Sequence, residues 1–316
     1  GSFHAMLWFG PALLVRPDIL PEILFVFVFL LIYIRRGRYR LLGGLLLTLL
    51  VVLLHTLWRH SYYGDWLPNT FYLKATGWPL RNRIASGIRN TIYTGVTFWA
   101  PDLFGAAAFI RPKKQYLVLT GCFIISTAYQ VYVGGDAWPL SRFVIPMSIG
   151  VFVLAGQGMH NLMSYLVNRR TGLPGTAVRF AMTLICIAGM NCIHWDHILF
   201  ISRPQTTCDN WMNIKYVLAL EKTAEPDATV AVTWAGVFPY FSKRPCIDLL
   251  GKCDSHISHL NADPDIKRAG HNKYDLVYSL NTFKPDIVLH VLDKTNHKLF
   301  EEYQLTAVNI EGEEMV

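Results

Sequence analysis

Long apolar stretches recur along the first two thirds of the chain, and short polar turns separate them. A helix that crosses a bilayer needs roughly 17 to 25 mostly apolar residues. The first stretch is shorter than that, and the others are of suitable length. We therefore predict about six to seven membrane spans, a polytopic α-helical membrane region over residues 1–203. The stretches cover residues 3–15, 19–34, 41–57, 91–110, 115–133, 143–167 and 177–193.

The turns between these stretches alternate in charge. Residues 35–40, 111–114 and 168–170 are basic and contain no acid, whereas residues 59–90 and 134–142 include aspartates. Short loops rich in Lys and Arg stay on the cytoplasmic side of a membrane. The pattern therefore places the acidic loops, and everything after residue 194, on the outer side.

The periodicity changes at about residue 204, where a water-soluble domain begins. Residues 211–222 have helical spacing, and residues 228–234, 247–251 and 284–291 read as strands. Strands that alternate with helices indicate a small α/β layer with parallel strands. We therefore expect an extracytoplasmic α/β domain over residues 204–316. It lacks the glycine-rich loops that cradle phosphates, so a nucleotide site has no support.

Composition agrees with a membrane protein more than with a nucleic-acid binder. The 316 residues are 52% hydrophobic and only 16% charged, whereas a soluble domain carries about 25% charged residues. The net charge of +7 lies largely in short loops beside apolar helices. There it orients the helices in a bilayer, which argues against nucleic acid as a partner.

Three of the outer segments each combine an acid with a base. They contain Arg16 with Asp18, Asp65 with Lys74, and Asp136 with Arg142. Pro17 predicts a broken helix at the first of them. Gly134 and Gly135 predict a tight turn before Asp136. Two interpretations of the third pair stay open: a structural ion pair, or a site in which Arg142 holds a phosphate through its planar fork of donors.

The strand-end loops of the second domain are rich in Asp and His, but their spacing matches no tight metal-ligand pattern. No cofactor is certain, and a divalent metal stays open. Of the six cysteines, Cys208, Cys246 and Cys253 would face an oxidising compartment. A disulfide between Cys246 and Cys253 is one option. Because three cysteines, an odd number, lie in this domain, their pairing stays open.

Four motifs in order resemble bacterial membrane glycosyltransferases of the GT-C class, in the branch similar to mycobacterial terminal arabinofuranosyltransferases. The motifs are Arg16-Pro17-Asp18, the segment from Tyr62 to Thr70, Gly134-Gly135-Asp136 with Arg142-Phe143, and Tyr240 with the segment from Ile247 to Asp254. The resemblance spans nearly the whole chain, although no single motif is specific.

The resemblance implies a polytopic GT-C-like enzyme of the bacterial inner membrane. Such enzymes transfer a sugar, with inversion, from a polyprenyl-phosphate donor to an extracytoplasmic glycan or lipid of the cell envelope. Their acidic base normally lies in the first external loop, which would precede Phe3 here. We therefore expect that this chain lacks the N-terminal part of the family module.

Candidate roles follow for the residues that are present. Asp136 and Asp65 are the candidate catalytic carboxylates. The candidate ligands of the donor phosphate are Arg142, Arg16, His60 and Lys74. The candidate contacts to sugar or acceptor are Tyr62, Tyr63, Asn69, Asp248, Asp254 and His256. Two alternatives stay open: a transporter or flippase of lipid-linked sugars, and a non-catalytic membrane assembly protein.

Overall fold

The computed structural model describes residues 2–34, 36–136, 142–168, 175–289, 300–301, 303–304, 308–310 and 313–315. Within it the chain forms two compact units. Unit 1 comprises residues 1–68 and 80–193, and unit 2 comprises residues 69–79 and 194–316. The short segment 69–79 therefore belongs with the C-terminal half of the chain, although it lies between two parts of unit 1 in the sequence.

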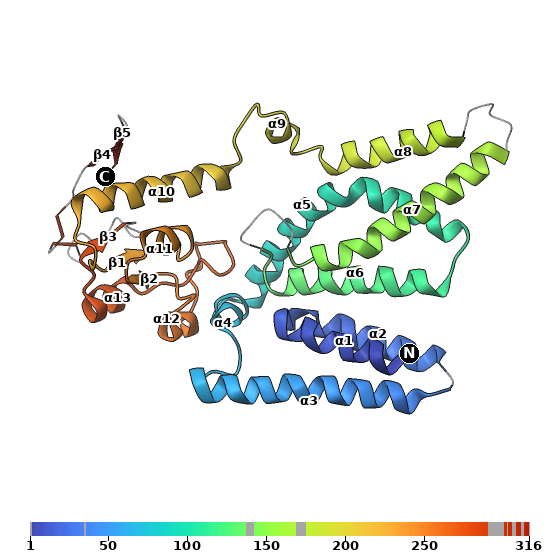
Figure 1. The fold of residues 1–316 in the computed structure, drawn as a ribbon, viewed down its shortest axis with the longest axis horizontal. Helices are drawn as coiled ribbons and strands as arrows, with labels where there is room; N and C mark the ends of the chain where they lie inside the picture. Colours follow the sequence, from blue (N-terminus) through green and yellow to red (C-terminus); the bar gives the residue numbers. More distant parts are fainter. Residues whose placement is uncertain are drawn as a thin grey trace. The chain divides into compact units, whose positions relative to one another are not determined.

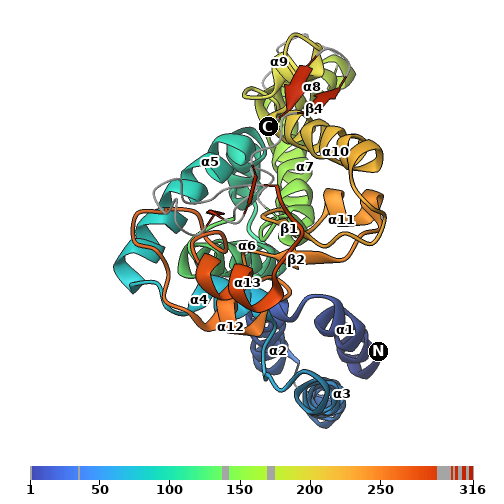
Figure 2. The ribbon, with the colours of Figure 1, turned by 90° about the vertical axis from the view of Figure 1, so that its left-hand side faces the viewer.

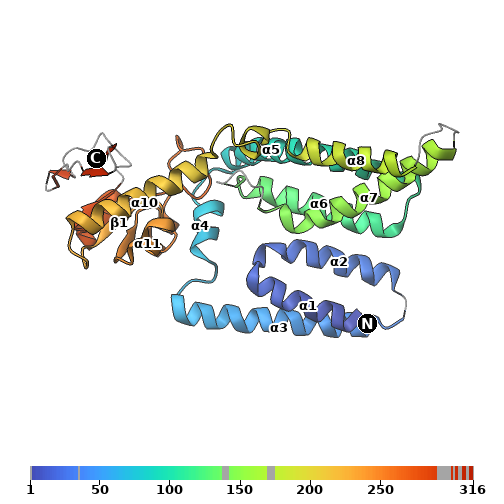
Figure 3. The same ribbon diagram turned by 45° about the horizontal axis from the view of Figure 1, so that its top comes forward.

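The regular elements in the described residues of unit 1 are all helices or 3₁₀ turns (Figure 1). One group of helices comprises α1 (Ser2–Val15), the 3₁₀ turn η1 (Pro17–Ile19), α2 (Leu20–Tyr33) and α3 (Arg38–Tyr63). The other comprises α5 (Leu80–Ala106), the 3₁₀ turn η2 (Ala107–Ile110), α6 (Lys114–Tyr132), α7 (Ile145–Asn168) and α8 (Gly175–Met190). Figure 3 shows α1, α2 and α3 next to one another. They share an apolar cluster of Met6, Phe27, Leu41 and Leu45.

Buried polar side chains join the helices of unit 1 to one another. Ser126 of α6 donates a hydrogen bond of 2.5 Å to the buried carboxylate of Glu22 on α2. Gln130 of α6 donates to the hydroxyl of Thr94 on α5 at 3.0 Å, and both side chains are buried. Buried polar groups need such partners, because a polar group that loses its hydrogen bonds to water and gains none in the protein raises the free energy of the folded state. These contacts therefore fix how α6 sits against α2 and α5.

Unit 2 is built on a three-stranded parallel sheet in the order β2-β1-β3, formed by β2 (Cys246–Asp248), β1 (Val230–Val232) and β3 (Ile287–Val288). Its helices are α4 (Asn69–Ala75), α9 (Trp195–Ile198), α10 (Gln205–Thr223), α11 (Val237–Ser242), α12 (Ser255–His259) and α13 (Leu276–Phe283). A separate antiparallel pair is formed by β4 (Val308–Ile310) and β5 (Glu313–Met315).

The central strand β1 is covered on both faces (Figure 2). Val230 and Val232 pack with Val217 of α10 and Phe238 of α11. Ala231 points the other way and packs with Leu276 of α13 and with Leu249. Parallel strands occur almost only where helices cover both faces of the sheet, which explains the unbroken apolar sequence of this strand.

The predicted polytopic architecture is wrong. Among the described residues, only α3 is long and apolar enough to cross a membrane by length and composition. At 1.5 Å per residue, the 14 residues of α1 and α2 and the 16 of α8 extend over about 21 to 24 Å, short of the roughly 30 Å of a bilayer core. Each predicted apolar stretch does contain a helix. However, helices that pack on one another inside a helical unit also have apolar sequences, so apolar content alone does not identify a membrane span.

The longer helices of unit 1 carry polar side chains that serve internal contacts. Asn161 of α7, for example, is buried and donates to the carbonyls of Ala107 and Ala108 at 3.2 and 3.1 Å. Hydropathy along the sequence counts these helices as apolar without showing that their polar groups have protein partners. That is why the sequence predicts more spans than the structure supports.

Several local predictions are confirmed. α1 ends at Val15 and α2 begins at Leu20, so the helix does break at Pro17. The parallel pairing of the strands predicted around residues 230, 247 and 287 is also present. The third strand was predicted to extend to residue 291, and residues 290–291 lie outside the described residues, as do residues 169–170 of the third basic turn.

Candidate functional site

The turn after α6 has the tight geometry that its two glycines predict. Gly134 and Gly135 adopt φ values of 89° and 90°, a region that disfavours any side chain. The amide of Gly135 donates to the carbonyl of Gln130 at 2.8 Å, which closes the end of the helix. Gly135 also lies against Asn90, because a Cβ built on it would be 2.7 Å from the Cβ of Asn90. The turn therefore brings Asp136 directly beside α5.

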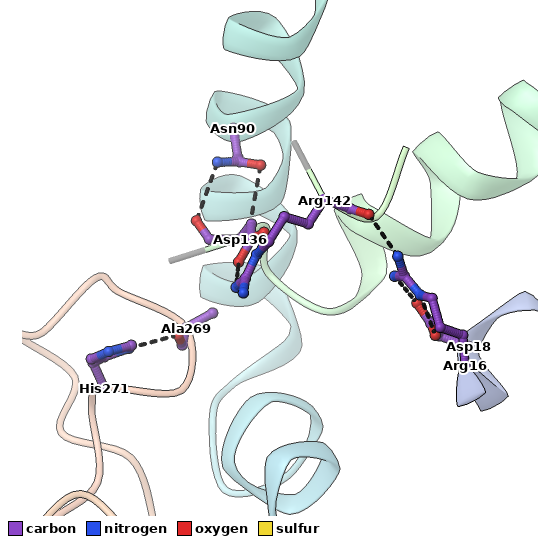
Figure 4. Close-up of polar contacts among 7 residues, drawn as sticks. All are labelled: Arg16, Asp18, Asn90, Asp136, Arg142, Ala269 and His271. Carbon is purple, nitrogen blue, oxygen red and sulfur yellow. Dashed lines mark hydrogen bonds and ion pairs between the residues drawn. The ribbon is translucent and has the colours of Figure 1, made fainter. Parts of the chain in front are cut away.

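The side-chain amide of Asn90, on α5, forms hydrogen bonds with both the backbone N–H and the backbone carbonyl of Asp136 (Figure 4). The amide N–H of Asp136 donates to Asn90 Oδ1 at 3.2 Å, and Asn90 Nδ2 donates to the carbonyl of Asp136 at 3.3 Å. A side-chain amide has one acceptor and two donor positions, so it can replace a backbone partner in this way. The position of Asp136 is thus set by a residue 46 positions earlier in the chain.

The guanidinium of Arg142 binds the carboxylate of Asp136 through two parallel hydrogen bonds. Its Nε donates to Oδ2 at 2.7 Å and its Nη2 donates to Oδ1 at 2.6 Å. The Asp136 side chain has no exposed surface, whereas half of the Arg142 side chain is exposed. The hydrogen bond to Asp136 raises the pKa of Arg142, so the guanidinium stays charged. A bidentate pair of this kind orients the arginine as well as binding it.

Arg16 connects the first predicted pair to this one (Figure 4). Its Nη2 and Nε donate to the two carboxylate oxygens of Asp18 at 2.6 and 3.2 Å. Its Nη1 donates to the backbone carbonyl of Arg142 at 2.9 Å. The structure therefore brings two of the three predicted acid–base pairs into one network of Arg16, Asp18, Asn90, Asp136 and Arg142. We call these five residues the arginine network.

The candidates at the end of α3 form an aromatic group. The ring of His60 stacks on Trp66, with centroids 4.0 Å apart and planes 7° apart. Tyr62 lies against Trp58 and Tyr63, and both tyrosines are largely exposed. The sequence predicts an external loop from residue 59, but α3 continues as helix to Tyr63. Asp65 follows the C-terminal Gly64 of this helix in the same unit.

The remaining candidates belong to unit 2, where several have structural contacts. Asp254 caps the N-terminus of α12 by accepting from the amide of Ile257 at 3.0 Å. Asp248 accepts from the amides of Leu250 and Cys253 at 3.0 and 2.8 Å. His256 lies 3.4 Å from the carboxylate of Asp275, which caps α13. These carboxylates shape the loops that follow the strands.

Asn69 and Lys74 lie on α4, within unit 2. Asn69 Nδ2 donates to the carbonyl of Lys252 at 3.4 Å. Asp65 and Lys74, predicted as a third acid–base pair, belong to different units.

Two residues that position these segments are absent from the sequence-based candidates. Asn90 looks like any polar residue on an amphipathic helix, so no pattern marks it. Lys273 is almost fully buried, and its ammonium donates to the carbonyls of Tyr72 and Ser258 at 2.9 and 2.8 Å. A lysine is expected at the surface, and only its place in the fold reveals this contact.

Two further expectations concern a disulfide and a metal site in the described residues. Cys246 and Cys253 are both free thiols, so the optional disulfide between them is not formed. Within the described ranges, no group of three or more His, Cys, Asp or Glu side chains could hold a metal ion.

Comparison with known proteins bears on unit 2 alone. A family described as a domain of unknown function (DUF8728) matches residues 201–314. The comparison with curated proteins found no match, and neither did the comparison with solved structures.

Proposed function

We propose that the chain is a membrane-associated glycosyltransferase that moves a sugar, with inversion, from a polyprenyl-phosphate donor to a glycan or lipid of the bacterial envelope. The resemblance in sequence suggests arabinofuranose as the sugar. The observation that carries the proposal is the bidentate pair of Arg142 and Asp136, in which a half-exposed cation is held by a fully buried carboxylate.

Arg142 is the proposed ligand of the donor phosphate. Two of its nitrogens bind Asp136, and the guanidinium remains half exposed, so it can take an anion on its outer edge. Arginine suits phosphate because its planar fork of donors matches two phosphate oxygens. A cation held in place before the reaction stabilises the charge that develops on the leaving phosphate. Arg16, which supports the backbone of Arg142, is a positioning residue in this proposal.

Asp136 is the proposed acceptor of the proton. While Arg142 grips it, its carboxylate has no exposed surface. A phosphate that draws Arg142 toward itself loosens this grip and frees a carboxylate oxygen. The acceptor hydroxyl then attacks the anomeric carbon, its proton passes to Asp136, and the bond to the phosphate oxygen breaks. The polyprenyl phosphate leaves with the electron pair of that bond.

The membrane side of the proposal rests on α3. This helix is long and apolar enough to cross a membrane, and most of its apolar side chains are exposed. Arg36, Arg38 and Arg40 lie at its N-terminal end, which assigns that end to the cytoplasm. Trp58 and the tyrosines at the other end suit the outer headgroup layer. The chain enters unit 2 at residue 69, so we assign unit 2 to the extracytoplasmic side of the bacterial inner membrane.

The test is sugar transfer by membranes that contain the full-length protein, with radiolabelled polyprenyl-phosphate sugars as donors. Arg142→Gln removes the charge and the fork, and we expect transfer to fall by a factor of about 100 or more. Asp136→Asn keeps the shape of the side chain and removes the base. The matched control is Arg111→Gln, an exposed arginine in the turn before α6, which should transfer at the wild-type rate.

Three results would contradict the proposal. Full transfer by Arg142→Gln and Asp136→Asn would remove both residues from the reaction. Binding of lipid-linked sugar without transfer from any donor would favour a transporter or flippase. Unchanged envelope glycan in cells whose Asp65, Asp136 and Arg142 are all replaced would favour an assembly protein.

A further inference from the structure

An apolar segment at the start of unit 2 is open to solvent. Phe200 has 94% of its surface exposed, Ile201 has 75% and Leu199 has 61%, and Trp195 and Ile198 are exposed as well. Single exposed apolar residues are common on soluble proteins, but several in succession form a patch that marks an interaction surface. We call residues 195–201, which comprise α9 and the residues after it, the apolar loop.

The backbone of the apolar loop closes on itself. Each of the six consecutive amides from His197 to Ser202 donates to a carbonyl between His194 and His197, over 2.7 to 3.2 Å. Among them, the amides of Ile201 and Ser202 both donate to the carbonyl of Asp196. Water is scarce where lipid headgroups meet acyl chains, so an amide without a protein partner is costly there. The amides of the apolar loop meet this requirement without a binding partner.

The same turn holds Phe200 outward. Its φ is 57°, in the left-handed region that a bulky side chain seldom adopts. The amide of Phe200 donates to the carbonyl of His197 at 3.2 Å, and the next amide, of Ile201, donates to the carbonyl of Asp196 at 2.7 Å. Hydrogen bonds on both sides therefore fix an unusual conformation whose side chain is almost fully exposed. Backbone strain of this kind is typical of functional positions.

The polar groups of the apolar loop gather at its two ends. The hydroxyl of Ser202 donates to Asp196 Oδ2 at 2.5 Å and lies 3.0 Å from His197 Nδ1. The exposed Arg203 follows directly, and Trp195 begins the loop. Tryptophan and arginine are residue types that suit the headgroup level of a bilayer. The most exposed apolar side chains lie between these ends in the sequence.

A membrane suits the apolar loop better than a protein partner does. A stable protein interface takes about 20 to 30 residues a side, whereas the loop runs only from residue 195 to residue 201. A bilayer needs no matching shape, and buried apolar area alone holds a segment at its surface. The chain also offers an anchor, because α3 of unit 1 is long and apolar enough to cross a membrane.

We propose that the apolar loop inserts into the membrane surface, with Phe200 and Ile201 among the acyl chains and Trp195 and Arg203 at the headgroups. The loop thereby gives unit 2 its own contact with lipid. This inference rests on the membrane association assigned to α3, and it does not depend on the transfer reaction at Arg142.

Site-specific photocrosslinking in the full-length protein tests the insertion. Phe200→benzoylphenylalanine keeps an aromatic ring at this exposed position. In vesicles of phosphatidylcholine and phosphatidylglycerol, illumination should attach a phospholipid, which mass spectrometry detects on the peptide. The matched control is the same replacement at Phe283, an exposed aromatic residue of α13, which should give at least about fivefold less lipid adduct. Equal yields at Phe200 and Phe283 would overturn the proposal.

A label at Leu54, an exposed residue of α3, separates this proposal from the membrane assignment on which it rests. Lipid adducts at Leu54 and Phe200 support both. An adduct at Leu54 without one at Phe200 would overturn insertion of the loop and leave the anchor standing. Adducts at neither position would reject both. Attachment of a protein at Phe200 in place of lipid would overturn the proposal in favour of a protein partner.

A second variant distinguishes insertion from mere closeness to lipid. With the crosslinker at Ile201, Phe200→Glu should lower the lipid adduct by about tenfold, because a charged side chain opposes entry into the acyl layer. Phe200 is exposed, so this change leaves the fold intact. Phe283→Glu is the control and should leave the adduct at Ile201 unchanged. An adduct that Phe200→Glu does not reduce would refute insertion.

Discussion

Arg142 binds Asp136 through two hydrogen bonds of 2.7 and 2.6 Å, and the pair joins a buried carboxylate to a half-exposed guanidinium. The pair links the turn that follows α6 to the residue that precedes Phe143 and α7. The pair therefore has a structural role whether or not the proposed reaction takes place. Its energetic coupling can be measured separately from activity.

A double-mutant cycle with Asp136→Asn and Arg142→Gln should show a coupling of about 1 to 2 kcal/mol in the free energy of unfolding, since both partners lose a bidentate charged contact. Denaturant unfolding of the four proteins provides the values. Strictly additive effects would mean that the pair adds nothing to stability.

Gly135→Ala should destabilise unit 1 by about 1 to 3 kcal/mol. Its φ of 90° is strained for alanine, and the new Cβ would meet the Cβ of Asn90 at 2.7 Å. Gly156→Ala in α7 is the matched control, because nothing lies within 4 Å of its added Cβ. That change should be neutral or stabilise the helix by up to about 1 kcal/mol. Thermal unfolding compares the two, and an equal effect at both sites would contradict the strained turn.

Lys273→Met should loosen the segment 69–79 from the rest of unit 2. It removes donors to the Tyr72 and Ser258 carbonyls and to the Thr76 hydroxyl, at 2.9, 2.8 and 3.3 Å. Acceptors left buried without partners reduce the free energy of unfolding by about 2 to 4 kcal/mol in all. Hydrogen exchange should show faster exchange in α4 than in α10, and Lys222→Met, at an exposed lysine of α10, should leave both unchanged. Uniform protection in the Lys273 variant would refute this role.

Lowering the pH should destabilise the protein through His271. Burial lowers its pKa to about 4 in the folded state, from an ordinary value of about 6.5. Between these values the unfolded state binds more protons, so stability is full above about pH 6.5 and falls as the pH approaches 4. Relative to His271→Gln, the wild type should lose on the order of 1 to 3 kcal/mol in this window. Parallel curves for the two proteins would show that His271 titrates normally.

Leu50→Arg should weaken membrane association through α3. Leu50 is 48% exposed on this helix, and an arginine near the centre of a spanning helix opposes insertion by roughly 2.5 to 3.5 kcal/mol. The protein should shift from the membrane to the soluble fraction after alkaline extraction. Leu218→Arg on α10 is the control and should leave the distribution unchanged. Membrane retention of the Leu50 variant equal to that of the wild type would argue against insertion of α3.

The sequence predicts local features well because their causes lie within a few residues. Pro17 lacks an amide hydrogen and fixes its own φ, so the helix break around it follows directly. Gly134 and Gly135 permit positive φ, so the turn before Asp136 is readable as well. The alternation of β-branched strands with helices likewise predicts a parallel sheet. The predicted number of membrane spans is wrong, because apolar content alone does not show which polar groups a helix pairs with inside the protein.

The sequence alone determined that each apolar stretch of the first two thirds contains a helix, that the three central strands of the second domain exist, that the first helix breaks at Pro17, and that Arg16, Asp18, Asp136 and Arg142 are candidates. Only the tertiary structure decided that Arg16 supports Arg142 and that Asn90 holds Asp136, contacts that join residues 126 and 46 positions apart. It also decided that segment 69–79 belongs with the C-terminal unit. These contacts depend on which helix faces pack together, and that choice is set by burial over the whole unit, so no local pattern records it.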